Sequence, residues 1–301
     1  MTDEIKSRRT GSRKETYLNE LESNTKRIVI KYGGNAMLDE TLKKSVAEDI
    51  VRLKNNGLNP IIVHGGGPAV SKQMDKEGKE PEFIQGQRKT DEETLEIAEM
   101  VLSGKVNKNL VGLINEKQGK AVGISGKDGH LVKSKKQKKE IEINGKIKKT
   151  DLGRVGQVQK VNTKLIETLI DKGFIPVISP ICAGEDEGDF NVNADILAGE
   201  IASSINADSL IYLTNVDGIQ EEKNDKDSRI KNLNIKKAES MIGTVIKGGM
   251  IPKVESAIKA IKDGVKNARI IDGTIQHSLI DSLEKNSNNG TILYSNKGEI
   301  N

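Results

Sequence analysis

Short runs of Ile, Val and Leu alternate with amphipathic segments along most of this chain, and this alternation strongly limits its fold. Short apolar runs bounded by glycine or polar residues are typical of strands buried on both faces. Strands are predicted at residues 28–30, 60–63, 121–124, 175–178, 210–213, 269–271 and 292–293, the last at a sheet edge. Helices are predicted at about residues 46–53, 91–116, 163–172, 194–205 and 252–265. We therefore expect an α/β fold with a mostly parallel sheet covered by helices on both faces.

The chain length of 301 residues suits one large domain or two modest lobes. Aromatic side chains are scarce, with no Trp, three Phe and four Tyr, so the core is expected to be aliphatic. Residues 1–26 are charged and polar and are predicted to form a flexible arm. Pro, Gly and acidic residues cluster at Pro180–Glu187. This cluster predicts a boundary between an N-terminal lobe, residues 27–180, and a C-terminal lobe, residues 181–301.

The single cysteine, Cys182, allows no disulfide within the chain, which fits a reducing compartment such as the cytoplasm. It follows an apolar run and is expected to be a small buried thiol. A nucleophilic role has little support, because the chain holds only three histidines. The charged N-terminus lacks the apolar core of a signal peptide, and no stretch approaches the length of a membrane span. We therefore expect a cytoplasmic protein with no membrane segment.

A lysine-rich segment, Lys133–Lys149, holds eight lysines. The excess of basic over acidic residues that gives the net charge of +4 lies in this segment and in the N-terminal arm. The isoleucines of the lysine-rich segment flank Asn144-Gly145, a dipeptide that favours a tight turn, so the segment is predicted to form a β-hairpin. Surfaces that bind single-stranded nucleic acid usually place aromatic rings among their cations, and this segment has none. A solvated hairpin is therefore favoured, and nucleic acid is not expected as a partner.

Four glycine loops follow predicted strands or precede predicted helices, at residues 31–35, 64–68, 215–218 and 247–250. In open α/β sheets, ligands bind at the carboxyl ends of strands, where glycine lets backbone N–H groups approach an anion. One such loop alone is more often only a turn, but several together favour a site for phosphate and carboxylate groups. The Walker A pattern and a strict GxGxxG are absent, so an ordinary P-loop or dinucleotide-binding enzyme is disfavoured.

Three charged residues are candidates for this site, and two of them, Lys31 and Lys253, adjoin glycine loops. Lys31 closes the first predicted strand, where a lysine is equally often a solvated end cap. Lys253 follows Pro252 in the first turn of a predicted helix, where a cation opposes the helix dipole and is better tolerated beside an anion. Asp195 follows Asn193, a suitable N-cap, so its position alone suggests a structural role. A functional role for Asp195 requires that both lysines lie close to it.

If the chain transfers a phosphoryl group to a carboxylate, lysines, an aspartate and glycine loops would suffice for catalysis. The pKa of the carboxylate, about 4.3, means that it is ionised at neutral pH and needs no general base. The obstacle is repulsion between this anion and the γ-phosphoryl group of ATP. Lysines, loop N–H groups and Mg²⁺ would spread that charge in the transition state. An aspartate between two lysines would fix their positions and reduce their mutual repulsion.

Seven segments, taken together and in this order, resemble the amino-acid kinase family over about residues 27–293. They are Ile30-Lys31-Tyr32-Gly33-Gly34-Asn35-Ala36-Met37, His64-Gly65-Gly66-Gly67-Pro68, Ala121-Val122-Gly123-Ile124-Ser125-Gly126-Lys127-Asp128-Gly129, Asp151-Leu152-Gly153, Asn191-Val192-Asn193-Ala194-Asp195, Leu213-Thr214-Asn215-Val216-Asp217-Gly218 and Gly248-Gly249-Met250-Ile251-Pro252-Lys253. The resemblance implies a three-layer αβα sandwich of two lobes. It also implies that the amino-acid substrate and a dimer contact lie in the N-terminal lobe and ATP in the C-terminal lobe.

The resemblance further implies an activity, the transfer of the γ-phosphoryl group of ATP, with Mg²⁺, to the side-chain carboxylate of N-acetyl-L-glutamate in arginine biosynthesis. The implied catalytic residues are Lys31 and Lys253, which stabilise the transition state, and Asp195, which organises them. The implied substrate-binding residues are Gly66, Gly67, Asn191 and Arg88, the last as a planar clamp on the α-carboxylate. The implied nucleotide-binding residues are Gly34, Thr214, Asn215 and Asp217. No metal held by protein side chains is implied.

Two departures from the arginine-inhibited members of this family leave assembly and feedback open. Those members carry an N-terminal helix that links dimers into a hexamer, whereas the arm of this chain is polar. They also carry an acidic stretch before the final Gly-Thr, where this chain has Lys285-Asn286-Ser287-Asn288-Asn289. We expect at least a homodimer, and these departures favour a dimer with weak arginine inhibition over a hexamer.

Two other interpretations are possible. A sister kinase of the same family would act on an acetylaminoadipate-type or carrier-linked acid, with a similar pocket around Arg88 and Asn191. A non-catalytic binding protein with the same fold is a different class of function. The joint presence of Lys31, Asp195 and Lys253 argues against that second interpretation.

Overall fold

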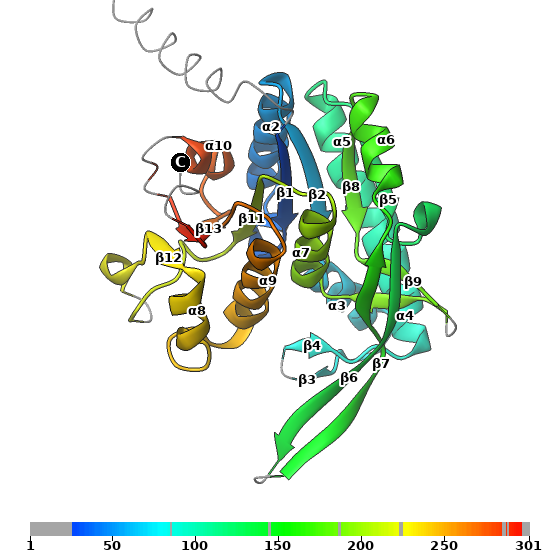
Figure 1. The fold of residues 1–301 in the computed structure, drawn as a ribbon. Coiled ribbons are helices and arrows are strands. Elements are labelled where there is room, and N and C mark those ends of the chain that lie inside the picture. Colours follow the sequence, from blue (N-terminus) through cyan, green and yellow to red (C-terminus); the bar gives the residue numbers. More distant parts are fainter. Residues whose placement is uncertain are drawn as a thin grey trace, which may run out of the picture.

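An eight-stranded sheet runs through the middle of the molecule (Figure 1). Its strands are β1 (Arg27–Tyr32), β2 (Asn59–His64), β5 (Ala121–Ser125), β8 (Ile175–Ser179), β11 (Ser209–Thr214), β12 (Asn232–Asn234), β13 (Asn267–Asp272) and β14 (Thr291–Tyr294). Their order is β12-β14-β13-β11-β1-β2-β8-β5, and all neighbours are parallel except β13 and β14. The predicted, mostly parallel sheet is confirmed.

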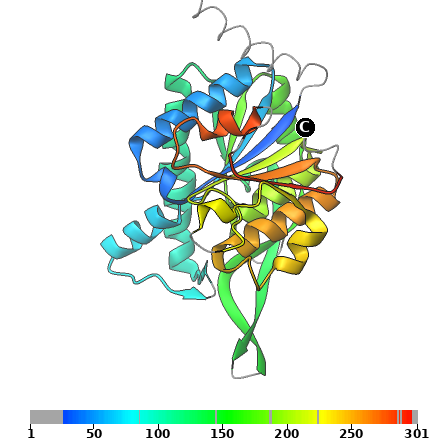
Figure 2. The same cartoon turned by 90° about the vertical axis from the view of Figure 1, so that its left-hand side faces the viewer.

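Helices cover both faces of this sheet (Figures 1 and 2). They are α2 (Glu40–Asn55), α3 (Gly67–Lys76), α4 (Glu92–Glu99), α5 (Asn107–Glu116), α6 (Lys164–Asp171), α7 (Ala194–Ser204), α8 (Ile235–Met241), α9 (Ile251–Lys262) and α10 (Ser278–Leu283). Alternate side chains of a strand point to opposite faces. On β1, Ile28, Ile30 and Tyr32 therefore share a core with α2, α5 and α10, whereas Val29 shares one with α6, α7, α8 and α9. This arrangement is the expected three-layer αβα sandwich, and its core is mainly aliphatic.

The predicted helix at residues 91–116 is one continuous helical segment whose pitch changes in the middle. Its α-helical ends, α4 and α5, are joined by a π-helix, η2 (Met100–Val106). π-Helices are rare and are frequent at functional sites. Here the π-helix places Leu102 against the loop after β2, where a Cβ added to Gly66 would lie 2.6 Å from Leu102 Cδ2.

A four-stranded barrel lies beside the main sheet. It is formed by β6 (Val132–Ile143), β7 (Lys146–Val161), β9 (Ile181–Gly184) and β10 (Phe190–Val192). β6 and β7 are antiparallel and pair up to Ile143 and Lys146, so the predicted hairpin is confirmed, and it projects from the body of the molecule (Figures 1 and 2). A separate two-stranded sheet consists of β3 (Phe83–Ile84) and β4 (Gln87–Arg88).

The computed structural model describes residues 26–296, apart from residues 85, 144–145, 186–187, 223–224, 285–286 and 288. Residues 1–25 of the predicted arm, the Asn144-Gly145 turn and most of the polar stretch before Gly290 therefore lie outside the described residues. Within the described ranges, no helix combines the length and the apolar character needed to cross a bilayer.

Strand β14 corrects one prediction. The expected strand at residues 292–293 exists, but it lies between β12 and β13 and is not at a sheet edge. The edge strand on this side of the sheet is β12, whose single apolar residue, Leu233, is flanked by two asparagines and forms no apolar run. In the predicted boundary at Pro180–Glu187, residues 181–184 form strand β9.

Candidate active site

The carboxyl ends of β1 and β2 lie side by side because these two strands are parallel neighbours. Tyr32, the last residue of β1, is in register with His64, the last residue of β2. The backbone N–H of Gly65 donates to the carbonyl of Tyr32 at 2.8 Å, which ties the two following loops together. The predicted glycine loops at residues 31–35 and 64–68 thus meet at the carboxyl end of the central strands, where ligands of open α/β folds bind.

Lys31, Asp195 and Lys253 form one ion-paired group at this end of the sheet. Lys31 Nζ lies 2.9 Å from Asp195 Oδ1, and Lys253 Nζ lies 2.9 Å from Asp195 Oδ2. The side chains of Lys31, Asp195 and Lys253 are only 9%, 8% and 14% exposed. The structure thus brings together residues from β1, α7 and α9, and Lys31 is a buried ion-pair partner, not a solvated end cap.

The charges in this group depend on one another. Burial alone would raise the pKa of the Asp195 carboxyl, but the nearby ammonium groups of Lys31 and Lys253 outweigh it and hold this pKa below its ordinary value. Burial lowers the pKa of Lys253, and repulsion by Lys31 acts in the same direction, while Asp195 opposes both. Asp195 therefore holds two cations close together, and one positive charge is left over for an anion.

A close crossing of α7 and α9 sets the distance between Asp195 and Lys253. Gly199 lies about one turn after Asp195 on α7, and Ser256 lies about one turn after Lys253 on α9. A Cβ on Gly199 would lie 2.1 Å from Ser256 Oγ, so a side chain here would push the helices apart. Ser256 Oγ donates to the backbone carbonyl of Asp195 at 2.9 Å. As predicted, Asn193 caps α7, and its Oδ1 accepts from the backbone N–H of Asp195 at 2.8 Å.

A cavity of about 230 Å³ opens beside the ion-paired group. Its wall contains most of the predicted site residues, namely Lys31, Gly34, Gly66, Gly67, Arg88, Asn191 and Asp195. Apolar side chains, among them Leu102 and Val155, complete the wall. Lys253 is outside the wall but bound to Asp195, and the predicted nucleotide residues of the loop after β11 line no part of this cavity.

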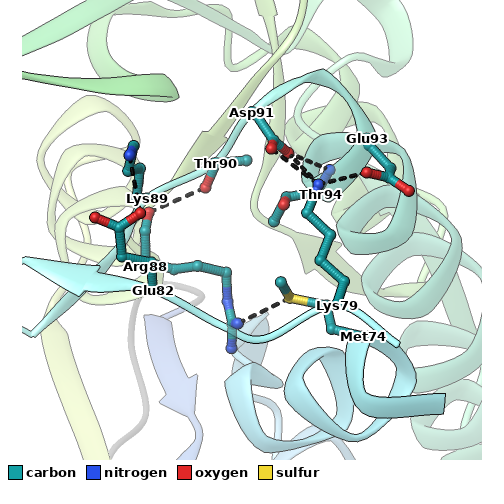
Figure 3. Close-up of polar contacts among 9 residues, drawn as sticks. All are labelled: Met74, Lys79, Glu82, Arg88, Lys89, Thr90, Asp91, Glu93 and Thr94. Atoms are coloured by element: carbon teal, nitrogen blue, oxygen red, sulfur yellow. Dashed lines mark hydrogen bonds and ion pairs between the residues drawn. The ribbon is translucent and has the colours of Figure 1, made fainter. Parts of the chain in front are cut away.

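Arg88 is buried and is held by uncharged groups, of which Figure 3 shows Met74. Its Nη2 donates to the carbonyl of Gly67 at 3.0 Å and to Ser71 Oγ at 2.7 Å, and its Nη1 lies 3.1 Å from Met74 Sδ. The guanidinium also lies over the ring of Phe83, 4.7 Å from the ring centroid. Burial lowers the pKa of Arg88, and the carboxylate of Asp75 acts against this lowering, but in the described part of the chain no ion pair joins Arg88 to an acid. Its charge is therefore available to an anion in the cavity.

The junction between β4 and α4, which carries Arg88, is fixed by neighbouring polar contacts (Figure 3). Thr90 Oγ1 donates to the backbone carbonyl of Arg88 at 3.0 Å. Lys79 follows α3, and its Nζ lies 2.8 Å from Asp91 Oδ1 and 2.6 Å from Glu93 Oε2. These ion pairs link the end of α3 to the start of α4, and exposed pairs of this kind contribute little to stability.

The predicted nucleotide-binding residues occupy two places. Gly34 begins a 3₁₀ turn, η1 (Gly34–Met37), with φ of 77°, a left-handed conformation that favours glycine. Thr214 ends β11, and its Oγ1 donates to Asn215 Oδ1 at 3.3 Å. Asp217 Oδ1 accepts from Gln220 Nε2 at 2.9 Å. Gly34 lines the cavity, whereas the other three lie at the end of the adjacent strand, outside its wall.

Several residues of the site carry no sequence signal. Leu102 and Val155 line the cavity, and Gly199 and Ser256 set the helix crossing, yet none belongs to a short motif that predicts such a role. Their roles depend on which segments fold against one another. Cys182 is fully buried away from the cavity, and burial raises the pKa of its thiol, as expected for a packing residue.

Known proteins resemble this chain over most of its length. Residues 26–272 match the amino acid kinase family. An acetylglutamate kinase of Methanococcus aeolicus is 48% identical over 268 residues, which cover 89% of this chain and 91% of that protein. An acetylglutamate kinase of Moorella thermoacetica is 47% identical over 269 residues, again 89% of this chain and 91% of the relative.

Solved structures share the same architecture. The N-acetylglutamate synthase of Neisseria gonorrhoeae gives a TM-score of 0.78 at 22% identity, over 94% of this chain and 62% of that chain. The carbamate kinase of Giardia gives a TM-score of 0.65 at 18% identity, over 90% of this chain and 99% of that chain. At these identities the likeness shows the fold alone. With the family match over most of its length and relatives near half identity, this chain belongs to the amino acid kinase family.

Proposed function

We propose that this chain transfers the γ-phosphoryl group of ATP to the side-chain carboxylate of N-acetyl-L-glutamate and forms N-acetyl-L-glutamyl 5-phosphate, a step of arginine biosynthesis. The observation that carries the proposal is the buried Lys31–Asp195–Lys253 group beside a cavity that also holds Arg88. The names of the relatives that match most of this chain support it. No observation favours an acetylaminoadipate-type or carrier-linked acid as the acceptor.

Lys31 and Lys253 have the charge and position to stabilise the transition state. An oxygen of the acceptor carboxylate forms a bond to the γ-phosphorus, the bond from that phosphorus to the β,γ-bridging oxygen breaks, and ADP leaves. No proton moves, because the acceptor is already ionised. The developing charge on the transferred group is met by two ammonium groups that are held in place before the reaction, which is the arrangement that accelerates such a step. Asp195 organises the two lysines.

The acetylated amino acid is proposed to lie against Arg88, Asn191, Gly66 and Gly67. Nη2 of Arg88 already donates to Gly67 O and Ser71 Oγ. The Met74 sulfur on Nη1 is a weak acceptor, and a substrate carboxylate would replace it readily. The side chain of Asn191 lines the same cavity and can donate or accept a hydrogen bond.

ATP is proposed to bind across Gly34 and the loop that contains Thr214, Asn215 and Asp217. Mg²⁺ is proposed to enter with the nucleotide. Asp195 is already neutralised by two lysines, so the site suits the phosphates of ATP better than a bare divalent cation. Mg²⁺ usually keeps several waters and binds through substrate phosphates, and its contribution would be to neutralise charge on them.

We also propose two lobes, residues 27–180 for the amino acid and a dimer contact and residues 181–301 for ATP, in a cytoplasmic homodimer. The strand order supports the division, because β1, β2, β5 and β8 form one half of the sheet and β11 to β14 the other. Light scattering of the full chain and of a chain without residues 1–26, alongside an arginine titration, would distinguish this dimer from a hexamer.

An ATP-dependent hydroxamate assay tests the proposed activity, because hydroxylamine traps an acyl phosphate as it forms. N-acetyl-L-glutamate should be the preferred acceptor over glutamate, aspartate and N-acetylaminoadipate. Preference for N-acetylaminoadipate would favour the sister activity. Failure to phosphorylate any of the four would refute the proposal for this chain.

A further inference from the structure

His64 lies directly beneath the glycine loop and takes no part in the chemistry proposed above. It ends β2, its side chain is 0% exposed, and it is not among the residues that line the cavity. Its Nδ1 lies 2.8 Å from the backbone carbonyl of Gly65, and its Nε2 lies 3.1 Å from Asn107 Nδ2. These two contacts connect α5 to the loop that forms one wall of the site.

The surroundings of Asn107 determine which imidazole nitrogen carries the proton. Asn107 Nδ2 donates to the backbone carbonyl of Val177 at 2.9 Å, and Asn107 Oδ1 accepts from Lys108 Nζ at 3.1 Å. The side-chain nitrogen of Asn107 therefore faces His64. It also lies 3.4 Å from the carbonyl of Ile124, farther than the 3.1 Å that separates it from His64 Nε2. An amide nitrogen can only donate, so Nε2 of His64 accepts and carries no proton. In a neutral imidazole the proton then sits on Nδ1, which donates to the carbonyl of Gly65.

Burial keeps this imidazole neutral. It lowers the pKa of His64 to about 4, and the nearby charge of Lys108 acts in the same direction. The contact with the Gly65 carbonyl opposes both and is too weak to restore the ordinary value. At neutral pH the ring is therefore a fixed donor on one side and a fixed acceptor on the other. It cannot act as a general base for a substrate that it does not contact.

The hydrogen bond to Gly65 sets the direction of the next N–H group. In a planar trans peptide, the carbonyl of one residue and the N–H of the next point in opposite directions. Because the Gly65 carbonyl points toward buried His64, the N–H of Gly66 points away from that ring, and Gly66 itself lines the cavity. The preceding peptide is also held, because the N–H of Gly65 donates to Tyr32 O at 2.8 Å. Within the described ranges, the N–H of Gly66 donates to no other residue.

We infer that His64 is a positioning residue for phosphoryl transfer. As the neutral Nδ1–H tautomer, supported by Asn107, it holds the Gly65–Gly66 peptide so that the Gly66 N–H faces the transferred group. This inference rests on the proposed function for the identity of that group, but the tautomer and the peptide orientation do not. A donor that is aimed before the reaction needs no reorganisation in the transition state, and this is the source of its effect on rate.

The first test is direct and independent of activity. The chain has only three histidines, so ¹⁵N-histidine NMR of the full-length protein gives few ring signals, and a His64→Asn variant assigns one of them by its loss. The His64 ring should show a protonated Nδ1 and a bare Nε2, unchanged between about pH 6 and pH 9. A proton on Nε2, or a titration within this range, would overturn the inference even if the enzyme phosphorylates acetylglutamate.

The second test compares His64→Asn with His64→Leu, two side chains of nearly equal size. The Asn amide nitrogen can replace Nδ1 as a donor to the carbonyl of Gly65, whereas Leu cannot. In the hydroxamate assay, His64→Leu should lower kcat by roughly 10–100-fold with little change in either Michaelis constant, which is smaller than the loss of a whole donor. His64→Asn should recover most of kcat. Both variants lose the contact with Asn107, so their melting temperatures control for stability.

The outcomes separate the two proposals. Equal loss of kcat in both variants, or wild-type kcat in His64→Leu, would overturn the positioning role. A wild-type enzyme that shows the Nδ1–H tautomer but phosphorylates no acetylated acid would overturn the proposed function and leave the geometry of the loop intact. If neither variant folds, the NMR of the wild-type rings against His130 and His277 still decides the tautomer.

Discussion

Gly199→Ala tests whether the close crossing of α7 and α9 sets the geometry of the ion-paired group. The new Cβ would lie 2.1 Å from Ser256 Oγ and 3.2 Å from the backbone carbonyl of Ser256. Rotation of the Ser256 side chain would relieve only the first contact, and it would break the hydrogen bond to the carbonyl of Asp195. Some separation of the two helices therefore follows, and Lys253 moves away from Asp195 with α9.

The expected cost combines three effects. Loss of the Ser256 hydrogen bond costs about 1 kcal/mol. Overpacking between the helices costs about 1–3 kcal/mol. Replacing glycine with alanine inside a helix stabilises that helix by about 1 kcal/mol. In sum, the free energy of unfolding should fall by about 1–3 kcal/mol. Because a misplacement of about 1 Å can lower a rate by about 100-fold, a partial shift of Lys253 should lower kcat by roughly tenfold.

Urea unfolding and steady-state kinetics with acetylglutamate measure the two effects. Gly112→Ala is the matched control, since this glycine also lies inside a helix, α5, but its added Cβ would meet no atom within 4 Å. That variant should gain up to about 1 kcal/mol of stability and keep its kcat. The double variant Gly199→Ala with Ser256→Ala should recover part of both losses. A Gly199→Ala enzyme as stable and as active as the wild type would refute the reasoning.

Three further predictions concern the same site. Lys31→Ala and Lys253→Ala should each lower kcat by roughly 10²–10³-fold, the usual effect of losing one fixed transition-state donor, and near-normal turnover in a folded variant would exclude that lysine from catalysis. Arg88→Lys keeps the charge but loses the planar fork, so it should raise the Michaelis constant for N-acetyl-L-glutamate and leave that for ATP nearly unchanged; an equal change in both would place Arg88 elsewhere. Because the folded-state pKa of Asp195 is lowered, its carboxylate adds stability that is full above its ordinary pKa and is lost as pH falls toward the lowered value. Between pH 6 and pH 3, the free energy of unfolding should fall less in Asp195→Asn than in the wild type.

The fold could be predicted from local patterns, because apolar periodicity marks buried strands and helix faces. The first strand was expected at residues 28–30 and is β1, Arg27–Tyr32. What local patterns do not contain is the identity of a strand's neighbours. Residues 292–293 form a strand as expected, but its place between β12 and β13 depends on contacts distant in the chain. The polar strand β12, which closes the sheet beside it, has no apolar run to predict it.

The site could be predicted only in part, for the same physical reason. From position alone, Lys31 suited a solvated strand end and Asp195 an ordinary first turn of a helix. Only the crossing of α7 and α9 brings Lys253 to Asp195, and the residues that allow this crossing, Gly199 and Ser256, belong to no motif. The N-cap at Asn193 was predictable, because a cap depends on neighbours within one turn. The family resemblance supplied residue roles that local chemistry could not.

The π-helix Met100–Val106 makes the length of this segment matter more than its composition. A π-turn holds about one residue more than an α-turn over the same span, so deleting one residue here would let the backbone return to α-helical spacing and leave the residues after it in place. One inserted residue would instead turn everything after it by about 100° about the helix axis, and Asn107, the next residue, would then leave the carbonyl of Val177 and the ring of His64. Substitutions at an exposed position such as Met100, which is 54% exposed, should be harmless. An insertion at the same position should not be tolerated, whereas the deletion of a single residue should be.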